Sequence, residues 1–497
     1  MFIIGHTIKP QRMCDISLLI SCVLFLTMTS SCEADAVHNV LLISFDGFRW
    51  DYYKKANYLT NIHRMIADGG WAVNGTKNVF ITKTLPNHFT MVTGLYQETH
   101  GIVGNVMYDH VFNATYYGGN YTIQSESRWY TGEPIWATNQ RQRTDYRSGC
   151  VCWPSSGAVL EGFRPYQHIP WKTAEDFPYK ERFKTAVKWF TDHEYPTNLV
   201  LVYIDNPDII GHTFGPDSDE LIHELLVLDE ALGYLFDLLI DEHLLDKTDI
   251  ILTSDHGMAS IPKDDSYKIE LTKYLTHGTY FVTDTSPTAC IFPTSPELED
   301  AIFQNLSSIK HAKVYRKADI PAEFHFKNNR RTPPIIIIPE EHYWCSNNNT
   351  YIAGNHGYSN DVADMHPFFA AMGPSFKKGS KVMTFNSVDV YPMLCTILGL
   401  KPAPNNGSMD VVAELLVDRL KENTGSTFGT YIFILIVGGL VSGVFAVAAC
   451  QVQRQLRRRR YQSHPIHKLP MSMMSVPSSR KEDAAIGLLS DMSDEEF

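Results

Sequence analysis

The chain has 497 residues, of which 44% are apolar and 20% charged, and its formal net charge is −12. This composition is typical of a globular protein with a sizeable core, and it argues against a mostly disordered chain and a multi-pass membrane protein. The acidic balance argues against non-specific nucleic-acid binding, which needs a basic surface. Nine cysteines are too few for a disulfide scaffold.

The N-terminal region predicts a secretory signal peptide. An apolar run over residues 16–28 follows Lys9 and Arg12 and precedes small and polar residues. A basic start, a short apolar centre and small residues beyond it are typical of such a peptide. The alternatives are an uncleaved anchor or a buried helix, but the run is shorter than the roughly 20 residues that span a bilayer. We therefore expect residues 1–32 to be a cleaved signal peptide.

Five near-continuous apolar runs predict buried strands, at residues 40–45, 199–204, 249–253, 335–338 and 368–372. Continuous rather than alternating apolar runs are typical of parallel sheet covered on both faces. Apolar residues recur at helical spacing between these runs, most clearly over residues 221–240. Strands that alternate with helices predict an α/β fold with a doubly wound, mostly parallel sheet. We expect a single domain over residues 33–426.

Acidic residues follow three of the predicted strands. Asp46 follows the first strand, residues 205–208 include two aspartates after the second, and Asp255 with His256 follows the third. Ligands of open α/β sheets collect at the carboxyl ends of the strands, so these side chains are expected to meet at one edge. A single carboxylate there is an ordinary capping group, but three of them with histidines nearby predict a metal site.

Histidines complete the candidate ligand set. Asp208 and His212 are four residues apart and can reach one ion from a single helical turn, whereas Asp255 and His256 are adjacent. His356 lies close to glycines on both sides. Mixed carboxylate and imidazole ligands suit zinc.

Thr84 is the candidate nucleophile. Pro86 is favoured in a first helical turn, so Thr84 is expected at or just before a helix N-terminus. Free backbone N–H groups and the helix dipole favour an anion such as phosphate there. A bound divalent ion lowers the pKa of a coordinated hydroxyl and makes it a competent nucleophile. Without the metal ligands, an ordinary N-cap threonine is the simpler interpretation.

The C-terminal region predicts a membrane anchor. Residues 430–450 carry no charge and are followed by Arg454 and four arginines at residues 457–460, which predicts a transmembrane helix whose C-terminal side is cytoplasmic. Residues 451–497 are expected to form a disordered cytoplasmic tail, with sorting adaptors as candidate partners of its Leu488-Leu489 pair.

Six Asn-x-Ser/Thr triplets lie between the two apolar ends and predict glycosylation. They begin at Asn74, Asn113, Asn120, Asn305, Asn348 and Asn406. The expected location is therefore the cell membrane, as a single-pass type I protein with the domain outside the cell.

The motifs in their order resemble the nucleotide pyrophosphatase/phosphodiesterase family of the alkaline-phosphatase superfamily. The matching stretches are SFDGFR at 44–49, TKTLPNH at 82–88, TGLY at 93–96, HGIVGN at 100–105, PDIIGH at 207–212, SDHGM at 254–258, HGY at 356–358 and MHP at 365–367. The segment GEPIWATNQ at 132–140 resembles the short type I membrane-anchored members.

This resemblance implies an alkaline-phosphatase-type fold and a phosphoric diester hydrolase that needs two Zn²⁺ ions. The implied substrates are extracellular nucleotides or dinucleotides, cleaved at phosphodiester or pyrophosphate bonds through a covalent threonine intermediate; no nucleic-acid polymer is expected as a partner. The implied ligands are Asp46, Thr84, Asp255 and His256 for the first zinc, and Asp208, His212 and His356 for the second. The implied substrate-binding residues are Thr84, Leu85 and Asn105, where Asn105 and a backbone N–H after the threonine hold a phosphate oxygen.

Four positions depart from the family pattern. Asn206 stands where many relatives have an acidic residue, and Ser359 where the family usually has aspartate. Neither is an implied ligand, so zinc binding is expected to survive with altered surroundings. Leu85 replaces an aromatic residue that stacks on the base in some members, and Val151 lies near another such position. Stacking contributes roughly 1–3 kcal/mol per base, so base binding is expected to be weaker or supplied elsewhere.

Two further functions are compatible with the sequence. A choline-headgroup lipid phosphodiesterase would keep all seven metal positions. A non-catalytic surface receptor or adhesion protein would keep the fold without turnover, although the intact ligand set and Thr84 argue against it. A monoesterase of the same superfamily is disfavoured because its usual nucleophile is serine.

Overall fold

The structure is a computed structural model that describes residues 38–420, apart from 57, 144, 146, 174, 175, 347–350 and 419, and residues 447–460. The chain divides into two compact units, Met1–Ser426 and Thr427–Phe497. The expected signal peptide and most of the expected span lie outside the described residues. Residues 447–460 are helical, and no helix in the described ranges is both long and apolar enough to cross a membrane.

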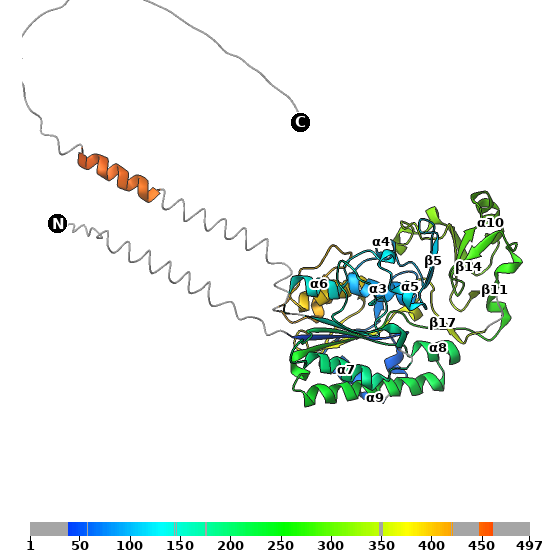
Figure 1. Ribbon diagram of the computed structural model, residues 1–497, viewed down its shortest axis with the longest axis horizontal. Coiled ribbons are helices and arrows are strands. Elements are labelled where there is room, and N and C mark those ends of the chain that lie inside the picture. The colour runs from blue at the N-terminus through cyan, green and yellow to red at the C-terminus, as the bar shows by residue number, and fades with distance from the viewer. Residues whose placement is uncertain are drawn as a thin grey trace, which may run out of the picture. The chain divides into compact units, whose positions relative to one another are not determined.

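An eight-stranded sheet forms the centre of the first unit (Figure 1). Its order is β19-β2-β18-β9-β1-β8-β6-β7, and five of the seven neighbouring pairs are parallel. The strands are β1 (Asn39–Phe45), β2 (Gly70–Ala72), β6 (Ser148–Val151), β7 (Gln167–Ile169), β8 (Leu199–Ile204), β9 (Thr248–Thr253), β18 (Phe369–Met372) and β19 (Ser380–Val382). The mixed α/β fold with a large, mostly parallel sheet agrees with the prediction.

Three of the predicted apolar runs form the adjacent strands β9, β1 and β8. Every residue of β8 and β9 is buried, because helices cover both faces of the sheet. Phe45 pairs with Ile204, and Ser44 pairs with Thr253. The carboxyl ends of the three strands therefore lie level with one another.

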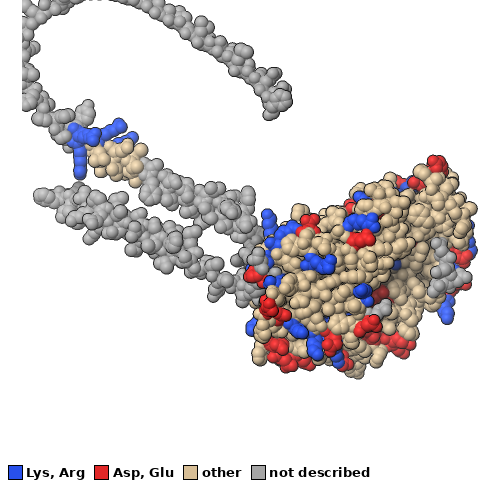
Figure 2. All heavy atoms as spheres, viewed as in Figure 1, with Lys and Arg blue, Asp and Glu red and all other residues tan. Residues whose placement is uncertain are grey.

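Helices pack on both faces of this sheet, with α7 and α9 on one face and α3, α5 and α6 on the other (Figure 1). In α9, leucines at three- and four-residue spacing are buried, and Ser218 Oγ caps the helix by accepting the N–H of Leu221 at 3.1 Å. The exposed acidic residues of α9 contribute to the charge along the lower edge in Figure 2. The helices are α2 (Thr60–Asp68), α3 (Thr84–Thr93), α4 (Gln97–His100), α5 (Tyr121–Gln124), α6 (Ile135–Gln142), α7 (Tyr179–Phe190), α8 (Asp208–Phe214), α9 (Asp219–Asp241), α10 (Glu299–Leu306) and α11 (Val390–Ile397).

A second sheet of four strands, in the order β12-β13-β15-β14, lies beside the central one. The strands outside the central sheet are β3 (Thr76–Lys77), β4 (Val106–Asp109), β5 (Ala114–Tyr117), β10 (Ala259–Ser260), β11 (Lys268–Glu270), β12 (Tyr280–Val282), β13 (Ala289–Pro293), β14 (Ala312–Arg316), β15 (Ile335–Pro339), β16 (Trp344–Ser346), β17 (Gly354–Asn355) and β20 (Phe385–Asn386). Short 3-10 helices lie at Tyr52–Lys54, Ser127–Trp129, Trp171–Thr173, Leu245–Lys247, Asp265–Tyr267, Leu271–Lys273, Pro296–Leu298, Lys317–Asp319, Ala322–Phe324, Ala363–Met365, Ser387–Asp389 and Val412–Leu415.

Two of the expected strands do not run as parallel strands of the central sheet. Residues 335–338 lie in β15, which is antiparallel to both β13 and β14 in the second sheet. Its isoleucines are all buried because alternate residues belong to two different hydrophobic clusters. Because both faces of the strand are buried, the run has the continuous apolar pattern that is also typical of a parallel strand. Residues 369–372 lie in the central sheet, but β18 is antiparallel to β9 and β2.

The asparagines of the predicted glycosylation sites lie at the surface wherever the structure describes them. Asn74, Asn113, Asn120, Asn305 and Asn406 are exposed. Asn348 lies outside the described residues. Their glycosylation stays a prediction.

An acidic side chain of α9 stabilises the start of α2. Asp229 accepts the N–H groups of Asn61 at 3.0 Å and Ile62 at 2.8 Å, whereas Leu59 at the N-cap offers no side-chain acceptor. We expect Asp229→Ala to lower the free energy of unfolding by about 2–3 kcal/mol, because buried N–H groups lose a charged acceptor. Denaturant unfolding checks this. The exposed Asp237→Ala change on the same helix should cost less than about 0.5 kcal/mol, and equal losses would contradict the capping role.

Candidate active site

Loops at the carboxyl ends of three central strands form the candidate site, as the strand pattern predicted. Asp46 follows β1, Asp208 begins α8 after β8, and Asp255 and His256 follow β9. The first two loops approach so closely that a Cβ at Gly47 would lie 2.9 Å from the Cβ of Asp208. Gly47 also has a φ of +70°, so this contact needs glycine.

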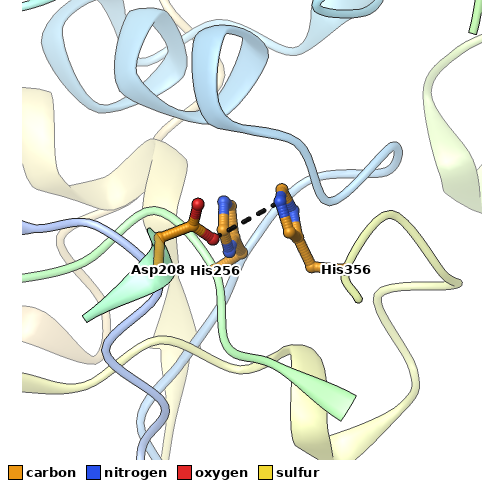
Figure 3. Close-up of side chains that lie close together, drawn as sticks. All are labelled: Asp208, His256 and His356. Atoms are coloured by element: carbon orange, nitrogen blue, oxygen red, sulfur yellow. Dashed lines mark ion pairs between the residues drawn. The ribbon is translucent and has the colours of Figure 1, made fainter. Parts of the chain in front are cut away.

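Five of the expected ligands form two overlapping groups whose ligand atoms lie within 4.8 Å of one another. The groups are Asp46, Asp255 and His256, and Asp208, His256 and His356. Figure 3 shows the second group, in which Nε2 of His356 lies 3.5 Å from Oδ1 of Asp208. His256 belongs to both groups, whereas the family resemblance placed it with the first zinc alone.

The other two expected ligands lie beside these groups. Nε2 of His212 is 3.5 Å from Oδ2 of Asp208, and Oγ1 of Thr84 is 3.3 Å from Nε2 of His256. The structure therefore brings all seven expected metal ligands together.

Each of the three histidines is fixed by a backbone carbonyl. Nδ1 donates from His212 to Gly354 at 2.8 Å, from His256 to Gly257 at 2.9 Å and from His356 to Thr82 at 2.9 Å. A carbonyl oxygen only accepts, so each Nδ1 carries the proton. In the neutral ring, Nε2 then presents its lone pair to the site, which is the usual arrangement of metal-binding histidines.

Carboxylate oxygens face these lone pairs without a partner of their own. Oδ1 of Asp46, Oδ1 of Asp208 and Oδ2 of Asp255 accept no hydrogen bond from any described residue. Oδ1 of Asp46 and Oδ2 of Asp255 lie 3.3 Å and 3.1 Å from Nε2 of His256. Lone pairs and buried carboxylates that converge in this way repel one another in the protein alone. Their chemistry fits a divalent cation.

The pKa shifts of Asp46 and His356 reflect the same crowding in a buried site. Burial, and then the charges of Asp255 and Asp208, raise the pKa of the Asp46 carboxyl well above its usual value. Burial, and then the neighbouring His256 and Lys83, lower the pKa of His356 well below its usual value. His356 is therefore neutral, which is the form that binds a metal.

Two groups that the sequence analysis did not single out hold the carboxylates in place, and a third, His88, lies beside them while its Nδ1 donates to the Thr84 carbonyl at 2.9 Å. Tyr203 Oη donates to Oδ2 of Asp46 at 2.6 Å, and the N–H of Gly47 donates to Oδ1 of Asp255 at 3.1 Å. Nδ1 of His88 lies 3.4 Å from Oδ2 of Asp255. His88 belongs to the TKTLPNH motif, so its position was a signal for this role, whereas Tyr203 lies within a buried strand and gave none.

Thr84 is the first residue of α3, as predicted. Its hydroxyl is therefore close to the positive end of the helix dipole. Beside it, Asn105 Oδ1 accepts the N–H of Leu85 at 2.9 Å, which leaves the Asn105 amide N–H₂ as the available donor. The backbone N–H expected to bind phosphate is thus bonded to Asn105 in this structure.

A pocket of about 380 Å³ opens in front of Thr84. Its lining includes Leu85 and Asn105, as expected, and also Trp171, Lys172 and Ile209. The indole N–H of Trp171 is buried and has no hydrogen-bond partner among the described residues. Sequence reasoning missed Trp171 because it lies far along the chain from every motif.

The departures from the family pattern have local explanations. Asn206 donates to Glu224 Oε1 at 3.0 Å and Tyr179 Oη at 2.8 Å, so a nearby carboxylate supplies the acidic group that Asn206 lacks. Ser359 Oγ accepts the N–H of Asp361 at 3.2 Å. Val151 is fully buried in β6 and offers no surface to a base.

Comparison with known proteins places the chain in a family. Residues 40–359 match the family described as type I phosphodiesterase/nucleotide pyrophosphatase. The chain is 38% identical to human ectonucleotide pyrophosphatase/phosphodiesterase family member 5 over 395 residues, which covers 79% of this chain and 81% of the relative. It is 36% identical to the mouse bis(5'-adenosyl)-triphosphatase over 436 residues, 87% of this chain and 91% of that protein.

Solved structures agree with this assignment. Murine ectonucleotide pyrophosphatase/phosphodiesterase 5, as an inactive threonine-to-alanine variant in complex with AMP, superposes with a TM-score of 0.72 and 36% identity, covering 76% of this chain and all of that chain. The human counterpart gives a TM-score of 0.72 and 38% identity, covering 76% and 99%. The chain is therefore a member of the type I phosphodiesterase/nucleotide pyrophosphatase family and a phosphodiester hydrolase.

Proposed function

We propose that this protein is a zinc-dependent hydrolase that cleaves phosphodiester or pyrophosphate bonds of extracellular nucleotides or dinucleotides through a covalent threonine intermediate. One observation carries the proposal: three anchored imidazoles and three carboxylates, each with one oxygen that has no donor among the described residues, converge beside the Thr84 hydroxyl at a helix N-terminus. The names of the relatives support the substrate class, since one is a bis(5'-adenosyl)-triphosphatase and one solved neighbour holds AMP.

Two Zn²⁺ ions are the proposed cofactors. The first set of ligands is Asp46, Thr84, Asp255 and His256, and the second is Asp208, His212 and His356. When bound, the ions lower the pKa of the threonine hydroxyl and offset the charge on phosphate.

The residues of the chain then carry out two displacements. Thr84 Oγ1 attacks phosphorus, and the bond from phosphorus to the leaving oxygen breaks as the new bond forms; the hydroxyl proton of Thr84 passes to solvent or to the leaving oxygen. Asn105 donates to a non-bridging oxygen where negative charge develops, and the N-terminus of α3 favours the same charge. A water oxygen next attacks phosphorus, and its proton restores the Thr84 hydroxyl as the adduct is released.

We further propose that the protein acts at the cell surface as a single-pass type I protein. The support is the apolar run at residues 16–28, the uncharged stretch at 430–450 with the arginines beyond it, and exposed asparagines in the described glycosylation sequences. Sorting adaptors remain the proposed partners of the tail, residues 451–497.

Metal removal tests the proposed cofactor. Purified protein is expected to hydrolyse a chromogenic nucleotide phosphodiester, to lose this activity with a chelator and to regain it with zinc. The thermal midpoint should fall on chelation, since a ligand at a hundredfold excess over its Kd stabilises the fold by about 2.7 kcal/mol. Cleavage of choline phosphodiesters alone would support the lipid phosphodiesterase. Bound zinc without turnover of either substrate would support the receptor.

Substitution of the nucleophile tests the covalent step. Thr84→Ala should lower kcat at least about a thousandfold, because no other group at the site replaces an attacking hydroxyl. Zinc content, measured by atomic emission, should remain near two per chain. Thr84→Ser is the matched control, since it keeps the hydroxyl and should retain measurable turnover. Substantial activity in Thr84→Ala would contradict the intermediate.

Trp171 is the proposed base platform that Leu85 does not supply. Trp171→Ala should raise KM for a nucleotide substrate by about 5- to 150-fold, the equivalent of roughly 1–3 kcal/mol of stacking. A chromogenic phosphodiester without a base is the control and should keep its KM. A change of KM that is equal for both substrates would show that Trp171 shapes the pocket without binding the base.

A further inference from the structure

A second cavity lies on the first unit, away from the catalytic ligands. It has a volume of about 800 Å³ and shares no lining residue with the pocket in front of Thr84. Its walls are the far end of the β4–β5 hairpin, with Tyr108 and His110, and segments of the second sheet around β13, α10 and β14. We call it the basic groove.

Positive charge dominates the lining of the basic groove. Arg316, Lys317, Lys327 and Arg330 line it together with a single carboxylate, that of Glu299. The Lys317 ammonium donates to the carbonyl of Asn329, and Lys327 forms no ion pair within the described part of the chain. Two lysines therefore keep uncompensated charge in a protein whose formal net charge is −12.

The arginines of the basic groove are held in fixed positions. Arg330 and Arg331 share one carboxylate, that of the buried Asp109, at 2.8 Å and 2.7 Å, so one negative charge serves two positive ones. Arg316 bonds to Asp300 at 2.8 Å and lies over the Phe303 ring at 4.2 Å. Guanidinium groups with restricted motion lose little entropy when an anion binds.

The aromatic residues of the basic groove disfavour a nucleobase as the ligand. Phe292 is 9% exposed and stacks on Phe281 with ring centroids 5.0 Å apart. Tyr108 packs edge-on against both rings. These contacts cover the Phe292 ring, and four cationic side chains make negative charge the main feature that the lining recognises.

We propose that the basic groove binds a sulfated glycan chain, with sulfate esters paired to Lys317, Lys327 and Arg330. The exposed amide side chain of Asn328 lines the same groove and suits sugar hydroxyls. An inorganic polyphosphate chain offers similar charge but no hydroxyl groups, so it is the competing ligand. This inference does not depend on the proposed catalytic mechanism.

Binding of a heparin-derived octasaccharide to the purified full-length chain tests the proposal. Calorimetry should show saturable binding that weakens as salt is raised. The double variant Lys317→Ala/Lys327→Ala should bind at least about tenfold more weakly, because two charge-assisted contacts are lost. Glu299→Gln should bind more tightly, because the one carboxylate in the lining is neutralised.

Matched controls decide between the outcomes. Lys184→Ala/Lys188→Ala removes two exposed lysines of α7 and should leave the affinity unchanged. Nucleotide hydrolysis by Lys317→Ala/Lys327→Ala should also be unchanged, which shows that the variant is folded. A desulfated octasaccharide should not bind. The proposal is overturned by no binding, by equal weakening in both double variants, or by tighter binding of polyphosphate of equal charge.

Discussion

Mutual repulsion of three carboxylates, two of them buried and one half-buried, is the constraint on which the rest of this structure depends. Asp46, Asp208 and Asp255 surround the Nε2 atoms of His256 and His356, and none of the oxygens nearest these atoms has a donor among the described residues. Coulomb repulsion in a poorly solvated site costs far more than in water. Residues that face one another in this way are stable together only around positive charge, so the loops are built to hold a cation.

The register of the central strands brings these carboxylates together. Because β1, β8 and β9 end level, the residues that follow them start from one edge of the sheet. The remaining candidate ligand comes from far along the chain: the short antiparallel pair of β10 and β17 brings residue 355 beside residue 259, and His356 is then fixed by the Thr82 carbonyl. Thr82 lies two residues before Thr84, so one loop positions both a ligand and the hydroxyl.

Prediction from the sequence succeeded where a residue pattern has only one physical cause. Runs such as 199–204 are apolar throughout because helices cover both faces, and motif spacing located the candidate ligands that the structure brings together. The prediction of a parallel strand was wrong where two different causes produce the same pattern. The strand β15 is apolar throughout because its alternate residues enter two clusters of an antiparallel sheet. Tyr203 and Trp171 were missed because their roles depend on contacts that no local spacing encodes.

The effect of a charged residue on an anionic substrate depends on where that residue lies in the protein. The exposed acidic residues of α9, such as Asp219, Glu220 and Asp237, face solvent, whereas Asp229 is buried against α2. The Debye length is about 8 Å at physiological ionic strength, so salt screens this solvent-exposed charge at longer distances. Within the site the carboxylates are directed at the positions of the proposed ions, and Lys172 lines the pocket. With the proposed ions bound, an anionic substrate would meet a field set mainly by these ions and the carboxylates around them, rather than by the acidic outer surface.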